Sequence, residues 1–344
     1  MSGYVVADIG GTTLRVGRLT AGRPDSVRRV ATEGLGRYPG EPGAELQRRV
    51  VRQLADTLGA YLDSSDRAVG MSFAGPITRD GVVTAAPTIW GPGAPPINIG
   101  EILEERLGVP VVVANDITAA AWRYAAIEID PFCLFTISSG IGNKVLRHGD
   151  VLVDDDGYGG ELGHWRVDPS PDAIPCDCGG RGHLGAVASG RGMVAAARVA
   201  AAAQPVSFAG SSLYSMADGD PAAIGSESLV AAVRADDEFA LDLLRIALRP
   251  LASAVACVFA AIGIRRYLFI GGFALAIGDR FIALLGDELV RQGCFGLTAQ
   301  QARAMLRLGA ADDDHSLIGI GELLARVLVG QSSDGGADAY AHHR

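Results

Sequence analysis

A unit of two strands joined by a glycine turn occurs twice in this chain, and this repeat constrains the fold most. Tyr4–Ile9 has the apolar, β-branched character of a strand, Gly10 opens a tight turn, and residues 14–19 form a second strand. The layout returns at Phe132–Ile137, with a glycine turn and a strand that begins at Lys144. Since one unit appears twice, far apart in the chain, the sequence predicts two similar α/β lobes.

Both turns have the chemistry of a phosphate site. Backbone N–H groups at a hairpin can face a phosphate, and glycine permits its close approach. In Walker and dinucleotide-binding loops the glycines join a strand to a helix, whereas here they join two strands. Asp8, at the end of the first strand, could hold a hydrated Mg²⁺ beside the phosphate. Two such turns could grip the two ends of one polyphosphate, although D-x-G-G-T also occurs in plain hairpins.

Hydrophobic periodicity predicts the remaining elements. Helices are expected at residues 45–61, 99–107, 117–127, 191–203, 228–233, 238–262, 281–292 and 316–329, and further strands at 68–73, 81–86, 110–114 and 266–270. The strand at 110–114 is followed directly by Asn115 and Asp116, and residues 204–221 are expected to form a loop. The small, polar residues 331–344 are expected to be a disordered tail.

A segment rich in histidine and cysteine lies between residues 161 and 190. His164, Cys176, Cys178 and His183 place two imidazoles and two thiols within twenty residues of Gly/Pro-rich chain. This pattern is typical of a closed tetrahedral zinc site. The alternative is two buried thiols and two surface imidazoles.

Composition excludes several classes of function. The net charge of −9 argues against nucleic acid as a partner. Lys144 is the only lysine, so Schiff-base and P-loop chemistry lose support. We find no signal peptide and no apolar run of about 18 residues, so no membrane association is expected. The 5 cysteines, an odd number with a C-x-C pair, favour a reducing cytoplasm.

Seven motifs, in order over nearly the whole chain, resemble those of the ROK family of sugar kinases, which has the actin/hexokinase-like (ribonuclease H-like) ATPase fold. They lie at residues 8–12, 73–76, 115–116, 139–142, 161–164, 176–190 and 271–272. The resemblance implies a two-lobed α/β protein with a central ATP/substrate cleft. We expect residues 1–115 with 316–330 to form the small lobe and 116–315 the large lobe. Homodimers are frequent among relatives, so a homodimer is expected by analogy alone.

The resemblance also implies roles for individual residues. Asp116 would be the general base that accepts the proton of the attacking hydroxyl, although a helix N-cap is its plain structural alternative. Asp8 would hold Mg²⁺ through water. The other substrate-binding residues would be Gly75, Asn115, Glu161 and His164. The ATP- and phosphate-binding residues would be Gly10, Gly11, Thr12, Thr13, Ser139, Gly140, Gly142, Gly271 and Gly272, the last two being alternatively a plain strand-to-helix turn.

Three departures from the family pattern bear on metal and substrate. His183 replaces a cysteine ligand, and since imidazole serves zinc well, we expect zinc to be kept. Gly185 replaces a glutamate that binds ring hydroxyls, and Thr88 replaces an asparagine common in hexose kinases. The phosphate motifs are intact, so catalysis is expected to persist while substrate recognition changes.

The leading hypothesis is therefore a kinase for a C7-cyclitol of the valiolone or valienone type, acting on the 7-hydroxyl in aminocyclitol biosynthesis. A glucokinase or another hexose or N-acylhexosamine kinase is the alternative. A non-catalytic sugar-sensing regulator of the family is disfavoured, because Asp8 lies too near the start of the chain for a preceding winged helix-turn-helix.

Overall fold

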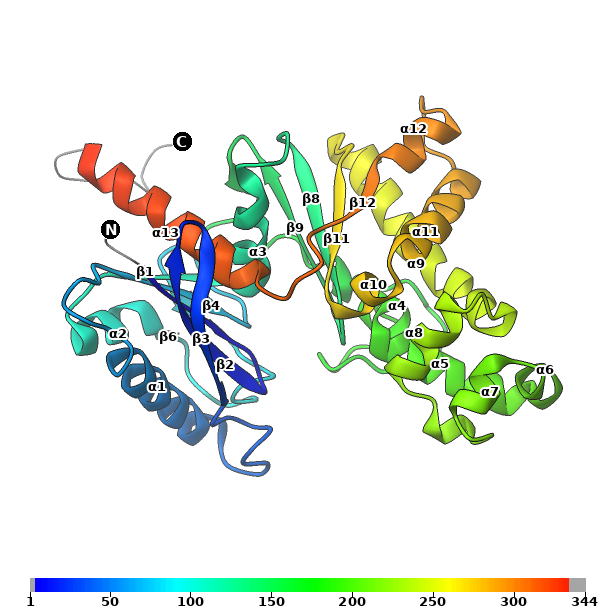
Figure 1. Ribbon diagram of the computed structural model, residues 1–344, viewed down its shortest axis with the longest axis horizontal. Helices are drawn as coiled ribbons and strands as arrows, with labels where there is room; N and C mark the ends of the chain where they lie inside the picture. Colours follow the sequence, from blue (N-terminus) through cyan, green and yellow to red (C-terminus); the bar gives the residue numbers. More distant parts are fainter. Residues whose placement is uncertain (1–3, 334–344) are drawn as a thin grey trace. The chain divides into compact units, whose positions relative to one another are not determined.

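The computed structural model describes residues 4–333, and these divide into two compact units. Unit 1 holds residues 4–128, 151–159 and 314–333, and unit 2 holds residues 129–150 and 160–313 (Figure 1). This division differs from the expected boundary at residue 115. The reason is that α3 (Asp116–Ala125) packs extensively on α13 (His315–Ser333) and so belongs to unit 1.

Unit 1 is built on a five-stranded mixed sheet of order β3-β2-β1-β4-β7. Its strands are β1 (Tyr4–Ile9), β2 (Thr13–Thr20), β3 (Arg23–Ala31), β4 (Val69–Phe73) and β7 (Val111–Asn115). β1, β2 and β3 pair antiparallel, whereas β4 pairs parallel to both β1 and β7. β3 was not predicted from the sequence, because its exposed, arginine-rich edge lacks a clear apolar alternation.

Helices cover both faces of this sheet. Val5, Ala7 and Ile9 of β1 share a core with α1 (Gly43–Gly59) and α2 (Ile99–Leu107). Val6 points to the opposite face and packs with residues of α3 and α13. Because both faces are covered, β1 and β4 are apolar almost throughout and do not alternate with polar residues. A small antiparallel pair, β5 (Val82–Val83) and β6 (Ile97–Asn98), replaces the longer strand expected at residues 81–86.

Unit 2 repeats the sheet order of unit 1. Its sheet runs β10-β9-β8-β11-β12, with the strands β8 (Phe132–Ile137), β9 (Ile141–Arg147), β10 (Asp150–Val151), β11 (Tyr267–Ile270) and β12 (Leu306–Leu308). β8 pairs antiparallel with β9 and parallel with β11, as β1 does with β2 and β4. The prediction of two similar α/β lobes is confirmed by this repeated order.

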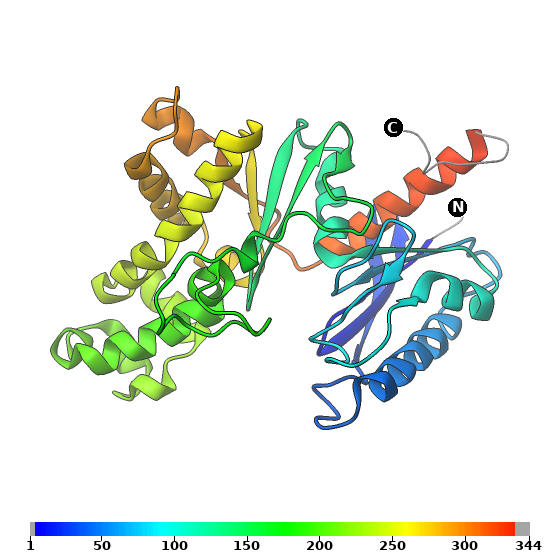
Figure 2. The same ribbon diagram turned by 180° about the vertical axis from the view of Figure 1, so that it is seen from behind.

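Helices of unit 2 pack around α9 (Glu238–Ile262), which the sequence predicted with the same bounds (Figure 2). The others are η1 (Leu162–His164), α4 (Leu184–Ala188), α5 (Gly190–Ala203), α6 (Pro205–Ala209), α7 (Ser212–Met216), η2 (Pro221–Ala223), α8 (Ser226–Arg234), α10 (Gly272–Ile277), α11 (Asp279–Gln292) and α12 (Ala299–Ala304). Within residues 4–333, α9 alone is long and apolar enough to span a membrane. Its residues Leu248, Leu251 and Val255 are buried in the core of unit 2, as expected for the central helix of a globular domain.

Two expectations about local structure are wrong in part. Residues 204–221 contain α6 and α7 where a loop was predicted, because each short helix is anchored by a single buried residue, Phe208 or Leu213, and so shows no periodicity. The predicted tail at 331–344 begins inside α13, which continues to Ser333, and residues 334–344 lie outside the described part of the chain.

Gly319 of α13 should be essential to the stability of unit 1. A Cβ at this position would overlap the carbonyl oxygen of Ala119 in α3, so Gly319→Ala must push the two helices apart. We expect a loss of about 1–3 kcal/mol in the free energy of unfolding, measured by urea denaturation. The matched control is Gly59→Ala at the end of α1, where the nearest atom lies 3.6 Å away. Gly59→Ala should leave the free energy of unfolding unchanged or raise it by up to about 1 kcal/mol. Equal free energies of unfolding for the two variants would contradict this account of the packing.

Candidate functional site

Asn115 ends β7 and organises the start of α3. Its Oδ1 accepts hydrogen bonds from the backbone N–H groups of Ile117 (3.0 Å) and Thr118 (3.2 Å), which makes it the N-cap. Its Nδ2 donates to Oδ1 of Asp116 (2.9 Å) and to the carbonyl oxygen of Gly75 (3.0 Å). Asn115, and not Asp116, is therefore the cap. Asp116 is left as the first residue of the helix, where the helix dipole favours a carboxylate.

The backbone around this pair is closely packed. A Cβ at Gly75 would overlap the carbonyl oxygen of Ala85, so only glycine fits there. Ser316 of α13 donates from Oγ to the carbonyl oxygen of Asp116 (3.2 Å). Three of the predicted site residues, Gly75, Asn115 and Asp116, are thus brought together in unit 1, with the carboxylate of Asp116 oriented by an amide.

Asp8, at the end of β1, has two partners that sequence reasoning missed. Its Oδ2 accepts from Nε (3.1 Å) and Nη2 (2.8 Å) of Arg15, and its Oδ1 accepts from Oγ of Ser72 (2.7 Å). Arg15 lies opposite Asp8 in the β1–β2 register and also approaches Asp314 (3.6 Å). Only the strand register could have revealed these pairs. A carboxylate oxygen accepts about two hydrogen bonds, so Oδ1 can still accept a metal-bound water.

The first glycine turn, between β1 and β2, is held at several points. Its predicted phosphate-binding residues are Gly10, Gly11, Thr12 and Thr13. The N–H of Gly10 donates to the carbonyl oxygen of Thr13 (3.0 Å), and Oγ1 of Thr32 donates to the carbonyl oxygen of Gly10 (2.7 Å). A Cβ at Gly11 would overlap the carbonyl oxygen of Thr88, whereas one at Gly10 would meet no atom within 4 Å. Gly11 is therefore required by packing, and Gly10 leaves an open approach to the turn.

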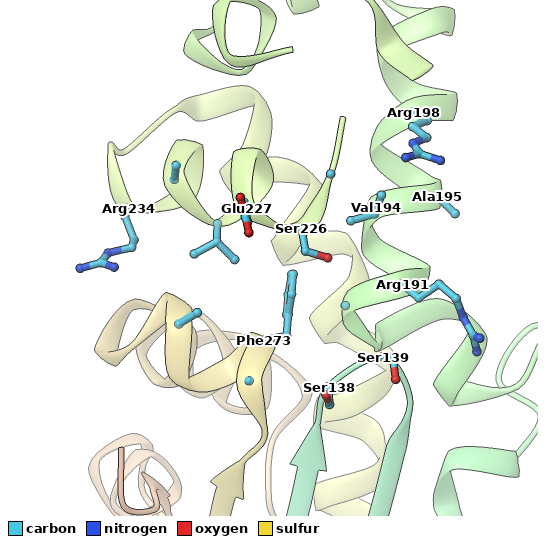
Figure 3. A pocket seen from close by; sticks show the side chains of 16 residues that line it. Ser138, Ser139, Arg191, Val194, Ala195, Arg198, Ser226, Glu227, Arg234 and Phe273 are labelled. Carbon is cyan, nitrogen blue, oxygen red and sulfur yellow. The ribbon is translucent and has the colours of Figure 1, made fainter. Parts of the chain in front are cut away.

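Unit 2 contains a pocket of about 880 Å³ beside the second glycine turn (Figure 3). The β8–β9 turn contributes Ser138 and Ser139, and α10 contributes Gly272 and Phe273, whose ring extends toward Ser226 at the start of α8 (Figure 3). Apolar walls with a few polar groups are typical of a small-molecule site, and the volume is within the usual range. Such a pocket can hold a flat aromatic base.

Of the residues predicted to bind ATP in unit 2, Ser139 and Gly272 line this pocket, whereas Gly140, Gly142 and Gly271 do not. Gly142 pairs with Thr136 in the β8–β9 ladder. Gly271 has a φ of +93°, and a Cβ there would lie 2.6 Å from the carbonyl oxygen of Ile137. Glycine is therefore required at position 271 by the backbone conformation and the close packing of the turn.

Charged residues of the pocket were missed by the sequence analysis. Arg191 and Arg198 lie on α5, and Glu227 and Arg234 on α8 (Figure 3). The sequence indicated helices here but no ligand. The seven-residue spacing of Arg191 and Arg198, which places both on one helix face, is the one signal that could have pointed to them.

The four predicted metal ligands converge in unit 2. The ligand atoms of His164, Cys176, Cys178 and His183 all lie within 4.8 Å of one another. The Cys176 Sγ lies 3.8 Å from His164 Nδ1, and the Cys178 Sγ lies 3.2 Å from His183 Nδ1. Tetrahedral zinc, with bonds of about 2.0–2.3 Å, requires ligand atoms roughly 3.3–3.8 Å apart. Two thiols and two imidazoles at these distances fit a tetrahedral metal ion.

Tight turns shape this cluster. The N–H of Gly179 donates to the carbonyl oxygen of Cys176 (2.9 Å), which bends the chain so that the two cysteines face one centre. Gly180 lies directly against the His183 ring, where a Cβ would overlap the imidazole. Burial raises the pKa of the Cys176 thiol. Because a metal binds the thiolate, binding must displace this proton, and affinity should fall as the pH is lowered.

Glu161 immediately precedes η1, and its carbonyl oxygen accepts from the N–H of His164 (2.9 Å). Its side chain is about half exposed and pairs with Nζ of Lys144 (3.2 Å), a partner that the sequence did not suggest. A Cβ at Gly185 would lie 3.1 Å from the carbonyl oxygen of Gly163. A side chain at position 185 would therefore start beside the segment that carries Glu161 and His164.

Comparison with known proteins identifies the family of this chain. The ROK family model matches residues 4–320. A C(7)-cyclitol 7-kinase from Streptomyces hygroscopicus subsp. jinggangensis (strain 5008) is 61% identical over 330 residues, covering 94% of each chain. A 2-epi-5-epi-valiolone 7-kinase from Actinoplanes sp. is 32% identical over 313 residues, covering 86% of this chain and 84% of that protein.

Among solved structures, a ROK family glucokinase from Streptomyces griseus in complex with glucose and AMPPNP superimposes with a TM-score of 0.72 at 27% identity. The match covers 93% of this chain and 98% of that one. These findings confirm the expected kinase family and its actin/hexokinase-like α/β fold. The chain belongs to the ROK family.

Proposed function

We propose that the chain is an ATP-dependent kinase that phosphorylates the primary 7-hydroxyl of a C7-cyclitol of the valiolone or valienone type, in aminocyclitol biosynthesis. The observation that carries this proposal is the 61% identity to a C(7)-cyclitol 7-kinase along almost the whole chain. The loss of a ring-binding glutamate at Gly185 agrees with it, since a carbocycle lacks the ring oxygen and anomeric centre of a hexose. The 5 cysteines are free, as expected in the cytoplasm, where we propose that it acts.

In the proposed reaction Asp116 accepts the proton of the attacking hydroxyl, and Asn115 holds the Asp116 carboxylate in position. Phosphoryl transfer depends mainly on positioning and on charge stabilisation, so a general base needs to be ionised and close to the hydroxyl but not strongly perturbed. The amide group of Asn115 can donate only to a carboxylate oxygen that carries no proton, and its Nδ2 lies 2.9 Å from Oδ1 of Asp116. Both residues would thus act in the same step.

We assign the nucleotide to the groups around the two glycine turns. The apolar pocket of unit 2 would hold the adenine and ribose, and the turns at Gly10–Thr13 and Ser139–Gly140 would contact phosphates. Asp8, which forms an ion pair with Arg15, would bind Mg²⁺ through water. Magnesium supplies charge neutralisation between the phosphates. Glu161 and His164 would contact hydroxyl groups of the acceptor.

A panel of acceptors tests the proposed substrate. We expect kcat/KM for a C7-cyclitol to exceed that for glucose, allose and N-acetylmannosamine by at least ~10²-fold, because a site built to pair specific hydroxyls rejects analogues that leave its polar groups unpaired. The measurement is a coupled ADP-release assay with each acceptor. A clear preference for glucose would refute the cyclitol assignment and favour the hexokinase alternative.

Asp116→Asn tests the catalytic base. The variant keeps the size of the side chain but cannot accept the proton, so kcat should fall by at least ~10²-fold while the thermal midpoint changes little. Unchanged turnover would remove Asp116 as the base.

Two helix caps provide the matched control for Asn115. Asn115 caps α3 and Asn98 caps α2, so alanine at either position should lower the free energy of unfolding by about 1 kcal/mol. Only Asn115→Ala also releases the carboxylate of Asp116, and only that variant should lower kcat. If both variants lost kcat equally, the loss in Asn115→Ala would be explained by lower stability and not by the release of the Asp116 carboxylate.

We propose that the His164, Cys176, Cys178 and His183 cluster binds a structural Zn²⁺ that fixes the segment carrying Glu161. Protein purified without chelator should contain about one zinc per chain by elemental analysis. Cys178→Ser should lose most of this zinc and lower the thermal midpoint, whereas Cys257→Ser, an exposed cysteine outside the cluster, should keep both. A zinc content well below one per chain in the unmodified protein would argue against the site.

A further inference from the structure

Lys144, the only lysine of the chain, is buried in β9 of unit 2 and faces an accessible carboxylate. Its side chain is 4% exposed, that of Glu161 is 55% exposed, and Nζ lies 3.2 Å from Oε1. An ammonium group removed from water is strongly destabilising unless opposite charge and hydrogen bonds compensate. The buried lysine is therefore the fixed partner of this pair, and the half-exposed glutamate is the partner that can meet a ligand.

The backbone on either side of Glu161 is also attached to β9. Oδ1 of the buried Asn143 accepts from the N–H of Leu162 (3.0 Å). Gly160, with a φ of +70°, lies so close to β9 that a Cβ would overlap the carbonyl oxygen of Asn143 and lie 3.0 Å from Cδ of Lys144. Two successive residues of β9 thus hold the segment. The side chain of Asn143 binds the backbone of Leu162, and the charge of Lys144 binds the side chain of Glu161.

We propose that Lys144 is a positioning residue that acts through Glu161 to set the affinity for the acceptor. This proposal rests on the proposed function, in which Glu161 contacts hydroxyls of the acceptor. A glutamate side chain in water samples several rotamers, and a charged partner with low mobility selects among them before the acceptor binds. The pair uses Oε1, and the accessible carboxylate can accept hydrogen bonds from a polyol as well.

The position of Lys144 has a further consequence. β9 starts at Ile141, directly after the turn that carries Ser139 and Gly140. β9 therefore follows the second glycine turn, which would contact phosphates, and also carries the lysine that orients the Glu161 carboxylate toward the acceptor. Both sets of contacts belong to one rigid hairpin of unit 2, with six register pairs between β8 and β9 from Phe132–Leu146 to Ile137–Ile141.

A double-mutant cycle on the full-length enzyme tests the proposal. Lys144→Met keeps the length of the side chain and removes the charge. We expect KM for the acceptor to rise about tenfold, with KM for ATP changed less than about twofold, because only the orientation of Glu161 is lost. In a Glu161→Gln background, the same substitution should leave KM for the acceptor unchanged, since its effect passes through the carboxylate.

Arg147→Met is the control, because Arg147 is an exposed cation on the same strand and its loss should alter neither KM. Lys144→Gln, which keeps a polar group in the buried position, repeats the test should the methionine variant fail to fold. The proposal is overturned if KM for the acceptor is unchanged in these variants, or if it rises equally with and without Glu161. The acceptor is whichever compound of the panel is turned over best, so a preference for glucose would refute the cyclitol assignment and leave this test intact.

Discussion

The structure of each unit depends on a central strand that is buried on both faces and paired on both edges. β1 and β8 each pair antiparallel with one neighbour and parallel with another, and the apolar side chains of both strands are buried on both faces. A strand in this position has to be apolar along almost its whole length. Polar groups are therefore found where the strand ends, at Asp8, the second-last residue of β1, and at Ser138 and Ser139 directly after β8.

The same constraint explains how the candidate site residues are oriented. β7 also ends in a polar residue, and there Asn115 satisfies the first N–H groups of α3 while its amide donates to Asp116 and Gly75. At the end of β1 the charge of Asp8 is compensated by Arg15 from the adjacent strand. Lys144, like Arg15, is a buried charge within a strand, and its burial is what makes it a fixed partner for Glu161.

Substrate choice in this chain is expected to depend on the segment between η1 and α4. His183 joins His164 and the two cysteines, so the departure from a cysteine ligand preserves a four-ligand cluster. Gly185, where the resemblance implies a glutamate in relatives, lies beside Gly163. The first departure thus leaves four possible metal ligands together, and the second would change the hydrogen-bonding groups near Glu161, in agreement with a family member that retains kinase chemistry but accepts a different ring.

The sequence by itself determined the repeated strand–turn–strand units, the Asn115-Asp116 pair at a strand end and the spacing of the histidines and cysteines. These are local properties of hydrophobic runs, glycines and short motifs, so they can be read without coordinates. Only the tertiary structure decided that Arg15 pairs with Asp8, that Lys144 pairs with Glu161, that Asn115 and not Asp116 is the cap, and that arginines of α5 and α8 border the pocket. Strand register and helix packing bring the paired and pocket-lining groups together from separate positions in the chain, and no local pattern encodes these contacts. The choice of the cap is local, but it depends on the extended backbone of Asn115, which the residue types of the Asn115-Asp116 pair do not specify.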